Sequence, residues 1–128
     1  MFDRPEVLGM ASALAANASA RLTAIAQNVA NADTPGYHAR DAQPFQDSYL
    51  AASGLPLRTT RPGHHNGFSG QMLTAVSDRA SGHMSPNGNN VSLENEMLAA
   101  AGVRQDHDLA LTIYRTSLGL LRTSLGRR

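Results

Sequence analysis

The sequence predicts a mainly α-helical protein in which long N- and C-terminal helices form a coiled-coil-like pair, with an irregular, loop-rich middle that has room for a short hairpin. Two observations carry this fold class. Apolar residues recur with a heptad period at both ends of the 128-residue chain. Prolines and glycines interrupt every helical period between them. We therefore divide the chain into an N-terminal helix with its turn (1–36), an irregular outer or linker region (37–90) and a C-terminal helix (91–128).

The N-terminal helix is expected to begin just after Pro5, since proline is well placed in a first helical turn. It must end by Asp33, because Pro35 moves Thr34 out of the helical region. Its apolar positions follow an unbroken heptad: Leu8, Ala11, Ala15, Ala18, Leu22, Ile25, Val29 and Ala32. Polar and small residues separate them, so the apolar stripe is narrow. A narrow stripe predicts a seam against another helix.

The stretch NVANADTPGY ends this helix and reverses the chain. Thr34-Pro35-Gly36-Tyr37 fits a type II turn, because proline supplies the fixed φ of the second position and glycine the positive φ of the third. Asn31 and Asp33 are expected to bond backbone groups left unpaired at the helix end. Taken alone, the turn is better explained as a generic helix stop.

The middle contains Pro44, Pro56, Pro62 and Pro86 among many Gly, Ser, His and Asn residues. We interpret it as loop, with brief strands expected over 55–60 and 71–76. The second helix should follow Ser92, a suitable N-cap, with Glu94 and Glu96 in a first turn where the helix dipole favours acids. Its expected seam residues are Met97, Ala100, Leu111, Tyr114, Leu118, Leu121 and Leu125.

Composition excludes several function classes. Cysteine and tryptophan are absent, net charge is +1, and the arginines form no long basic run, so neither thiolate chemistry nor nucleic-acid binding is expected. No apolar run is long enough to cross a bilayer. Nucleophile-elbow and phosphate-loop motifs are missing, and no paired carboxylates suggest acid and base roles. We therefore expect no enzyme, no cofactor and no small-molecule substrate.

The histidines raise one alternative, a metal-binding helical module. His64 and His65 are adjacent, however, and neighbouring residues of an extended loop point to opposite sides, so we favour solvated side chains and no metal site. The N-terminus raises another, since VLGMASALAANASA resembles a signal peptide with an A-x-A cleavage pattern. The heptad continues through the supposed cleavage site, so we expect no cleavage.

These residues resemble the flagellar axial proteins of the rod and hook. The family's N-terminal signature is close to N-x-A-N-x-x-T-x-G-Y, and the matching residues are Asn28, Ala30, Asn31, Thr34, Gly36 and Tyr37. The DTPG variant is similar to the rod subgroup. HARDAQPF resembles the K-A-R-D-x-x-F segment of proximal-rod members, NGNNVSLENEM resembles their D-G-N-N-V-D-L-x-x-E-M segment, and LLRTSLG resembles L-R-T-A-I-G. His38 and the stretch VRQDHDLALTIYR depart from the family pattern.

The resemblance implies a structural subunit of the bacterial flagellar basal body, in the periplasmic proximal rod that links the MS ring to the drive shaft. It implies export through the flagellar type III apparatus without a cleaved signal peptide. The implied partners are copies of itself, other rod proteins, the adaptor protein FliE and the MS-ring protein FliF. Another rod component remains the alternative. The expected assembly contacts are Leu8, Ala15, Leu22, Ile25, Val29, Leu111, Leu118, Leu121 and Leu125, with the motif residues Asn28, Asn31, Thr34, Pro35, Gly36 and Tyr37.

Overall fold

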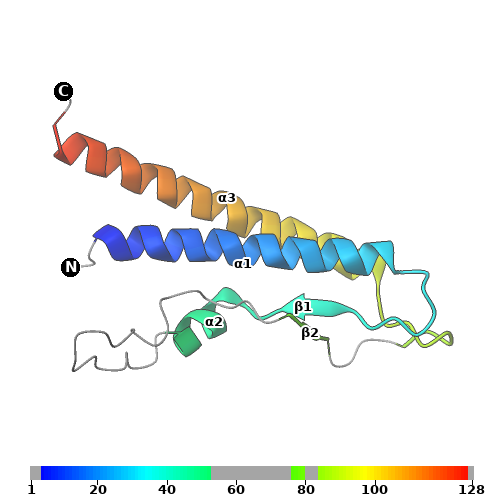
Figure 1. The fold of residues 1–128 in the computed structure, drawn as a ribbon. Helices are drawn as coiled ribbons and strands as arrows, with labels where there is room; N and C mark the ends of the chain where they lie inside the picture. The colour runs from blue at the N-terminus through cyan, green and yellow to red at the C-terminus, as the bar shows by residue number, and fades with distance from the viewer. Residues whose placement is uncertain (1–3, 53–75, 80–83, 127–128) are drawn as a thin grey trace, which may run out of the picture.

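The computed structural model describes residues 4–52, 76–79 and 84–126. Its elements in chain order are α1 (Arg4–Ala30), β1 (Arg40–Ala42), α2 (Phe45–Ala52), β2 (Val76–Asp78) and α3 (Leu93–Ser124). Helices α1 and α3 run side by side in opposite directions, so the two chain ends lie at the same end of the molecule (Figure 1). The expected fold class is confirmed.

The helical pair is held by a small apolar core. Ala18, Ile25 and Val103 are buried, and the half-buried Leu22, Ala99 and Ala100 pack against them. Alanine has no side chain beyond Cβ, so the two helices approach closely but remove little apolar area from water per residue. The core lies nearer the turn than the chain ends, and the ribbons diverge toward the termini (Figure 1).

The expected heptad frame agrees better with α1 than with α3, since three of its eight residues in the N-terminal helix are buried and none of its seven residues in the C-terminal helix is. Ala11, Ala18 and Ile25 are buried as expected. In α3 the buried residues are Glu96, Val103 and Ala110, and none of them belongs to the expected seam. Small side chains let α3 lie close to the alanines of α1, and polar partners hold Glu96 inside. The bulkier Met97 and Leu125 are therefore left 70% and 84% exposed.

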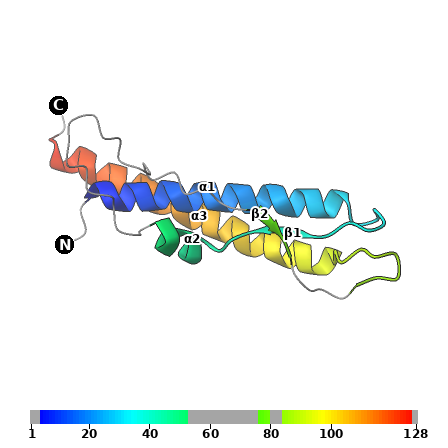
Figure 2. The same cartoon turned by 60° about the horizontal axis from the view of Figure 1, so that its bottom comes forward.

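A second covered face of α1 corrects the expectation of a narrow stripe. Residues 39–52 and β2 form an arm that lies along α1 (Figures 1 and 2). Asn17, Ala24 and Asn28 of α1 are buried, and the Asn17 amide donates to the Gln43 carbonyl over 3.0 Å. Polar residues of α1 thus face inward because the arm presents backbone groups to them.

The arm contains the hairpin and a helix that was not expected. Strands β1 and β2 pair antiparallel, with Arg40 opposite Asp78 and Ala42 opposite Val76. The strand expected over 55–60 lies outside the described residues, as does 71–75 of the other. The loop expected over residues 45–52 is instead the helix α2, in which the Phe45 and Tyr49 rings lie one turn apart at 5.6 Å. No helix within the described ranges is long and apolar enough to cross a membrane.

Candidate functional site: a polar joint at the base of the helical pair

The turn that follows α1 has the expected conformation. The Tyr37 N–H donates to the Thr34 carbonyl over 3.3 Å, and Gly36 has φ +72°. The Asn31 side-chain amide donates to the Gln27 carbonyl over 2.8 Å, but this oxygen already accepts from the Asn31 N–H, so the side chain adds a second bond rather than pairing a free group. Pro35 presets the preceding position of the turn. The turn is thus specified by its own residues.

A residue far along the chain completes the end of α1. The side-chain amide of the buried Asn89 lies 2.8–3.0 Å from the carbonyl oxygens of Asn31, Ala32 and Thr34. Its Oδ1 accepts from the Val91 N–H over 2.7 Å. These three carbonyls belong to the turn that follows α1, so Asn89 holds the turn from more than 50 residues away in the sequence.

Two turns therefore lie against each other. The Gly36 N–H donates to the Asn87 carbonyl over 3.0 Å, and the Asn90 N–H lies 3.4 Å from the Tyr37 carbonyl. Gly88 has φ +79°, and a Cβ built there would lie 3.5 Å from the Gly36 Cα. The stretch TPGY and the stretch NGNN form one structural unit, although one precedes and the other follows the whole arm.

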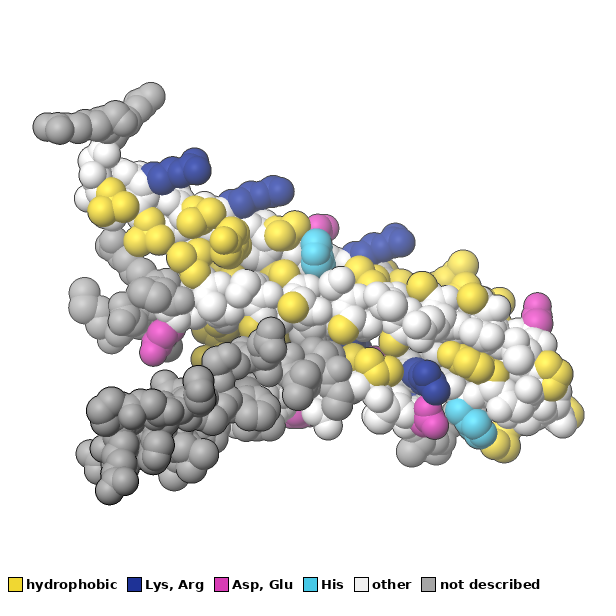
Figure 3. Space-filling view, viewed as in Figure 1, with side chains coloured by type: hydrophobic (Ala, Val, Ile, Leu, Met, Phe, Trp, Pro, Cys, Tyr) yellow, Lys and Arg dark blue, Asp and Glu magenta, His cyan; other side chains and the backbone are white. Residues whose placement is uncertain are grey.

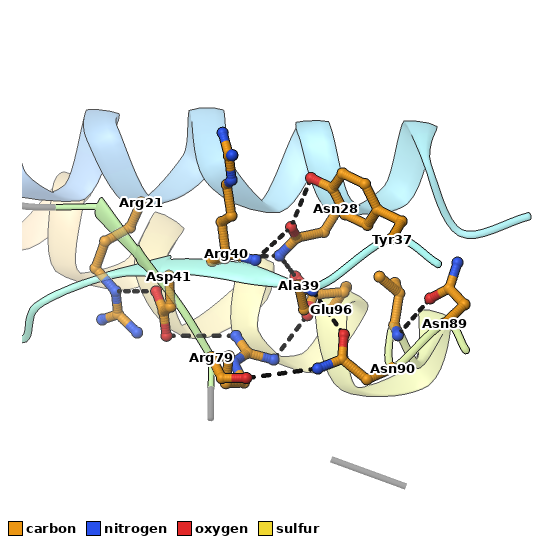
Figure 4. A network of polar contacts seen from close by, with 11 residues as sticks. Arg21, Asn28, Tyr37, Ala39, Arg40, Asp41, Arg79, Asn89, Asn90 and Glu96 are labelled. Carbon is orange, nitrogen blue, oxygen red and sulfur yellow. Dashed lines mark hydrogen bonds and ion pairs between the residues drawn. The ribbon is translucent and has the colours of Figure 1, made fainter. Parts of the chain in front are cut away.

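The Asn28 side chain joins α1 to the arm by forming the two backbone hydrogen bonds that a neighbouring strand would form with β1. It is fully buried, and its amide donates to the Arg40 carbonyl over 2.8 Å while its Oδ1 accepts from the Arg40 N–H over 2.8 Å. Both backbone groups of one β1 residue are thus paired by a single side chain (Figure 4). The Tyr37 hydroxyl donates to the same Oδ1 over 3.3 Å.

Glu96 carries the buried charge of the joint. Its Oε2 accepts from the Asn28 amide over 3.0 Å, and its Oε1 lies 2.8 Å from an Arg79 guanidinium nitrogen. Glu96 lies in the first turn of α3, as expected, but its side chain is fully buried, so the helix dipole is not its only partner. A buried carboxylate requires such partners, because desolvation without them is strongly unfavourable. Ser92 does take the N-cap position but makes no side-chain capping bond.

An ion-pair chain extends from Glu96 along the arm. Arg79 also lies 3.3 Å from Asp41, and Asp41 lies 3.5 Å from Arg21 of α1. The chain Arg21–Asp41–Arg79–Glu96 alternates in sign and is neutral overall (Figure 4). It connects both helices with both strand segments, so we call this cluster, with Asn28, Tyr37, Asn89 and Asn90, the polar joint. Asn90 belongs to it because its Oδ1 accepts from the Ala39 N–H.

The joint is a structural site rather than a reactive one. The Glu96 carboxylate oxygens are both engaged by donors, and the Asn28 amide and carbonyl both bond other groups. Over residues 4–52, 76–79 and 84–126, no group of three His, Cys, Asp or Glu side chains is placed to hold a metal ion. His64 and His65 lie outside these ranges.

The expected assembly residues are placed in three environments. Ile25 is buried between the helices, whereas Val29 is 41% and Leu125 84% exposed. The half-buried residues are Leu8, Ala15, Leu22, Leu111, Leu118 and Leu121. Sequence reasoning missed Arg21, Asp41, Arg79, Asn89 and Asn90 as members of the joint. Asp41, Asn89 and Asn90 had one signal, their place in HARD and NGNN, which belong to stretches that match the family, whereas Arg21 and Arg79 had none.

An elongated antiparallel helical pair, pinned to a side arm by a polar joint and without a reactive cluster in its described part, is the architecture of a structural subunit. The model of the family described as flagella basal body rod protein matches residues 10–38, which include most of α1 and the turn. The chain is also 30% identical over 115 residues to the flagellar basal body rod protein FlgB of Agrobacterium fabrum, covering 87% of this chain and 86% of the relative.

The chain therefore belongs to the flagellar basal body rod proteins. It is a structural subunit of the rod in the flagellar basal body, as the resemblance of its motifs implied.

Proposed function

We propose that the protein is a proximal-rod subunit, without enzymatic activity, that polymerises through its terminal helices. The observation that carries this proposal is the apolar surface of α3 that its own fold leaves bare. The large apolar residues of α3 that are more than a third exposed are Leu93, Met97, Leu98, Leu109, Tyr114, Leu120 and Leu125. A single soluble chain gains nothing from such a surface, whereas a subunit packed among others covers it.

The seam residues divide this work between folding and assembly. Ile25 stabilises the helical pair itself, since its side chain is 4% exposed. Leu111, Leu118 and Leu121 lie at the seam edge and are half-buried, so a neighbouring helix has apolar area left to cover. Leu8, Ala15, Leu22 and Val29 supply the corresponding edge of α1. Asn28, Asn31, Thr34, Pro35, Gly36 and Tyr37 act indirectly, because they set the direction in which the arm leaves the helices.

The proposed place of the subunit is the base of the rod, between the MS ring and the rest of the drive shaft. Similarity to FlgB supports this place over that of another rod component. Its neighbours would then be copies of itself, other rod proteins, the adaptor FliE and the ring protein FliF, after delivery by the flagellar export apparatus. Photo-crosslinking from the exposed Leu125 in isolated basal bodies tests the place: adducts with the ring protein or the adaptor support it, and adducts restricted to distal rod proteins contradict it.

Polymerisation is tested separately with Leu118→Asp. The half-buried position tolerates the change in the single chain better than Ile25 would, so the variant should fold and be exported but fail to enter basal bodies. Gln46→Asp places the same charge at an exposed position of α2, away from the polar joint, and should assemble normally. Circular dichroism of both purified variants controls for folding. Normal incorporation of Leu118→Asp would contradict the assignment of the seam edge to assembly.

A further inference from the structure

The second turn of the polar joint contains an asparagine followed directly by a glycine, Asn87 and Gly88. This pair has its own chemistry, because glycine has no side chain to hinder the approach of its backbone nitrogen to the asparagine side chain. The nitrogen gives its proton to a base and bonds to Cγ, the Cγ–Nδ2 bond breaks, and the leaving nitrogen takes up a proton and departs as ammonia. Water then opens the resulting five-membered imide, a succinimide, at either carbonyl. The products are aspartate and isoaspartate.

Asn87 lies where water reaches it. The turn that contains it and the turn after α1 form the end of the molecule opposite the two chain ends (Figure 1). The visible surface at this end consists mostly of backbone and uncharged polar side chains (Figure 3). Asn87 itself is exposed. Burial therefore does not keep the succinimide from forming, and any protection by the fold comes from hydrogen bonds.

The attacking nitrogen is held by the fold. The Gly88 N–H donates to the Ser85 carbonyl over 2.8 Å, and the Ser85 N–H donates to the Asn89 carbonyl over 2.8 Å. The nitrogen attacks only after it has lost its proton, and the hydrogen bond keeps that proton in place and fixes the direction of the N–H. A Cβ built at Gly88 would lie 3.5 Å from the Gly36 Cα, so the facing turn also limits how far Gly88 can rotate.

The side chain under attack is held as well. Asn87 Oδ1 accepts from the Asn89 N–H over 3.1 Å, the bond of an Asx turn. By itself this bond draws electrons away from Cγ and favours attack. It also fixes the side chain, whereas attack requires the side chain and the backbone to move toward each other. Because the Gly88 nitrogen becomes a nucleophile only when its own hydrogen bond opens, the opening of the turn controls the rate.

We propose that Asn87 is a site of spontaneous succinimide formation in the unfolded chain, and that closing the joint protects it. The Gly88 nitrogen is free to lose its proton only while the turn is open, so the extent of modification records the time that the chain has spent unfolded. Neither step depends on the rod function proposed above, because both concern groups within a single chain.

The two products differ in their effect on the joint. Aspartate keeps an oxygen that can accept from the Asn89 N–H, and the family segment that this stretch resembles has aspartate in the place of Asn87. Isoaspartate carries the main chain through Cβ and Cγ, so the turn between Ser85 and Gly88 becomes one atom longer. The Asn87 carbonyl that accepts from the Gly36 N–H over 3.0 Å then leaves the main chain. Isoaspartate should therefore separate the two turns, and aspartate should not.

Ageing the purified chain in its folded and unfolded states tests the protection. The natural chain is kept in mildly alkaline buffer with and without urea, and loss of the Asn87 amide is followed by mass spectrometry of its peptides. We expect the loss to be at least about tenfold slower in the folded chain. A synthetic peptide of residues 84–91, aged in both buffers, corrects for any effect of urea on the chemistry. Equal corrected rates in the two states, or no loss in urea, would overturn the proposal.

A pair of asparagine variants tests whether the joint is the protecting element. Asn89→Ala removes the side chain that holds the turn after α1, so the folded variant should lose the Asn87 amide several times faster than the natural chain. Asn95→Ala makes the same change at an exposed position of α3 and should leave the rate unaltered. Circular dichroism shows that each variant is folded. An unchanged rate in Asn89→Ala would show that the joint does not protect Asn87.

Hydrogen exchange compares the two products in one sample. The chain aged in urea is refolded, exchanged and digested, and the peptides with isoaspartate and aspartate are separated by chromatography although their masses are equal. We expect the isoaspartate peptide to have lost the protection of the Gly88 and Asn90 amides, which donate to Ser85 and Tyr37, while the aspartate peptide retains it. Equal protection in the two peptides would contradict the proposed difference between the products.

Discussion

The fully buried Asn28 offers the sharpest test of the polar joint, through the isosteric change Asn28→Asp. The side-chain amide now donates to the Arg40 carbonyl over 2.8 Å and to Glu96 over 3.0 Å. Replacing that nitrogen by a carboxylate oxygen removes the donor from both hydrogen bonds and places two acceptor oxygens opposite each other at each contact. It also places two carboxylates side by side in a buried site.

The expected loss can be worked from these distances. Two unit charges 3.0 Å apart repel by about 5.5 kcal/mol at an effective dielectric constant of 20. Holding one carboxyl protonated at pH 7, against an ordinary pKa of about 4, costs about 4 kcal/mol. Protonation costs less than the charge repulsion, so the carboxyl pair formed by Glu96 and the new aspartate of the variant takes up one proton. That proton restores one of the two hydrogen bonds of the amide, and the loss of the other adds about 1 kcal/mol. Asn28→Asp should therefore destabilise the chain by roughly 4–5 kcal/mol at pH 7.

The pH dependence follows from the direction of the shift. The pKa of the new carboxyl pair is raised by folding, so the penalty is present above the unfolded pKa and disappears as the pH falls toward about 4. At pH 5 the difference from the natural chain should shrink to roughly 2–3 kcal/mol. Urea unfolding followed by circular dichroism at both pH values measures it.

The control is Gln27→Glu, which adds a carboxylate at the neighbouring exposed position and should change stability by less than about 0.5 kcal/mol. A loss under about 1 kcal/mol for Asn28→Asp at pH 7, or a loss that does not change with pH, would refute our account of the joint.

Three further substitutions test the joint and the turn. Arg79→Met removes the partner of the buried Glu96 and should cost about 2–3 kcal/mol, whereas Arg40→Met removes an exposed pair and should cost about 0.5 kcal/mol or less, both by urea unfolding. Gly36→Ala keeps open space around the new Cβ but holds alanine at φ +72°, so we expect a loss of about 1 kcal/mol, and an unchanged unfolding midpoint would contradict the assigned turn. Asn89→Ala should lower stability by about 2–3 kcal/mol and expose the amides of the turn after α1 to hydrogen exchange. Unaltered exchange would show that the Asn89 side chain does not hold this turn.

The joint explains why the family signature has its particular residues. The Asn28 side chain pairs with β1, the Asn31 amide bonds Gln27, and the Thr34 hydroxyl donates to the Asn31 side chain. Gly36 takes the positive φ, and Tyr37 donates to Asn28. A generic helix stop needs none of the long-range partners. The end of α1, strand β1 and the turn at 87–90 are thus hydrogen-bonded to one another here, and each of them constrains the sequence of the turn after α1.

Local signals predicted the two helices and the turn between them. Pro35 and Gly36 have strong backbone preferences that do not depend on distant residues, so the end of α1 was expected within a few residues of Ala30. The heptad predicted that α1 and α3 pair. It did not give the correct seam of α3, because large leucines dominate a sequence pattern whereas small residues such as Ala110 fit between closely packed helices.

The arm and the joint could not be predicted locally. Strand β1 has three residues and is held largely by the Asn28 side chain and by β2, neither of which is near it in sequence. Helix α2 is eight residues long, too short to be stable without tertiary packing. Glu96 had a sufficient local explanation at the start of α3, and only the folded chain brings Arg79 and Asn28 to it.

The central claim is that helix faces left bare in the single chain are covered by neighbouring subunits in the rod. The most direct measurement is the rate at which a water-soluble maleimide labels Leu109→Cys, first in the purified chain and then in isolated basal bodies. We predict rapid labelling of the purified chain, where the position is 53% exposed, and strong protection in the basal body. Equal rates in the two states would contradict the account.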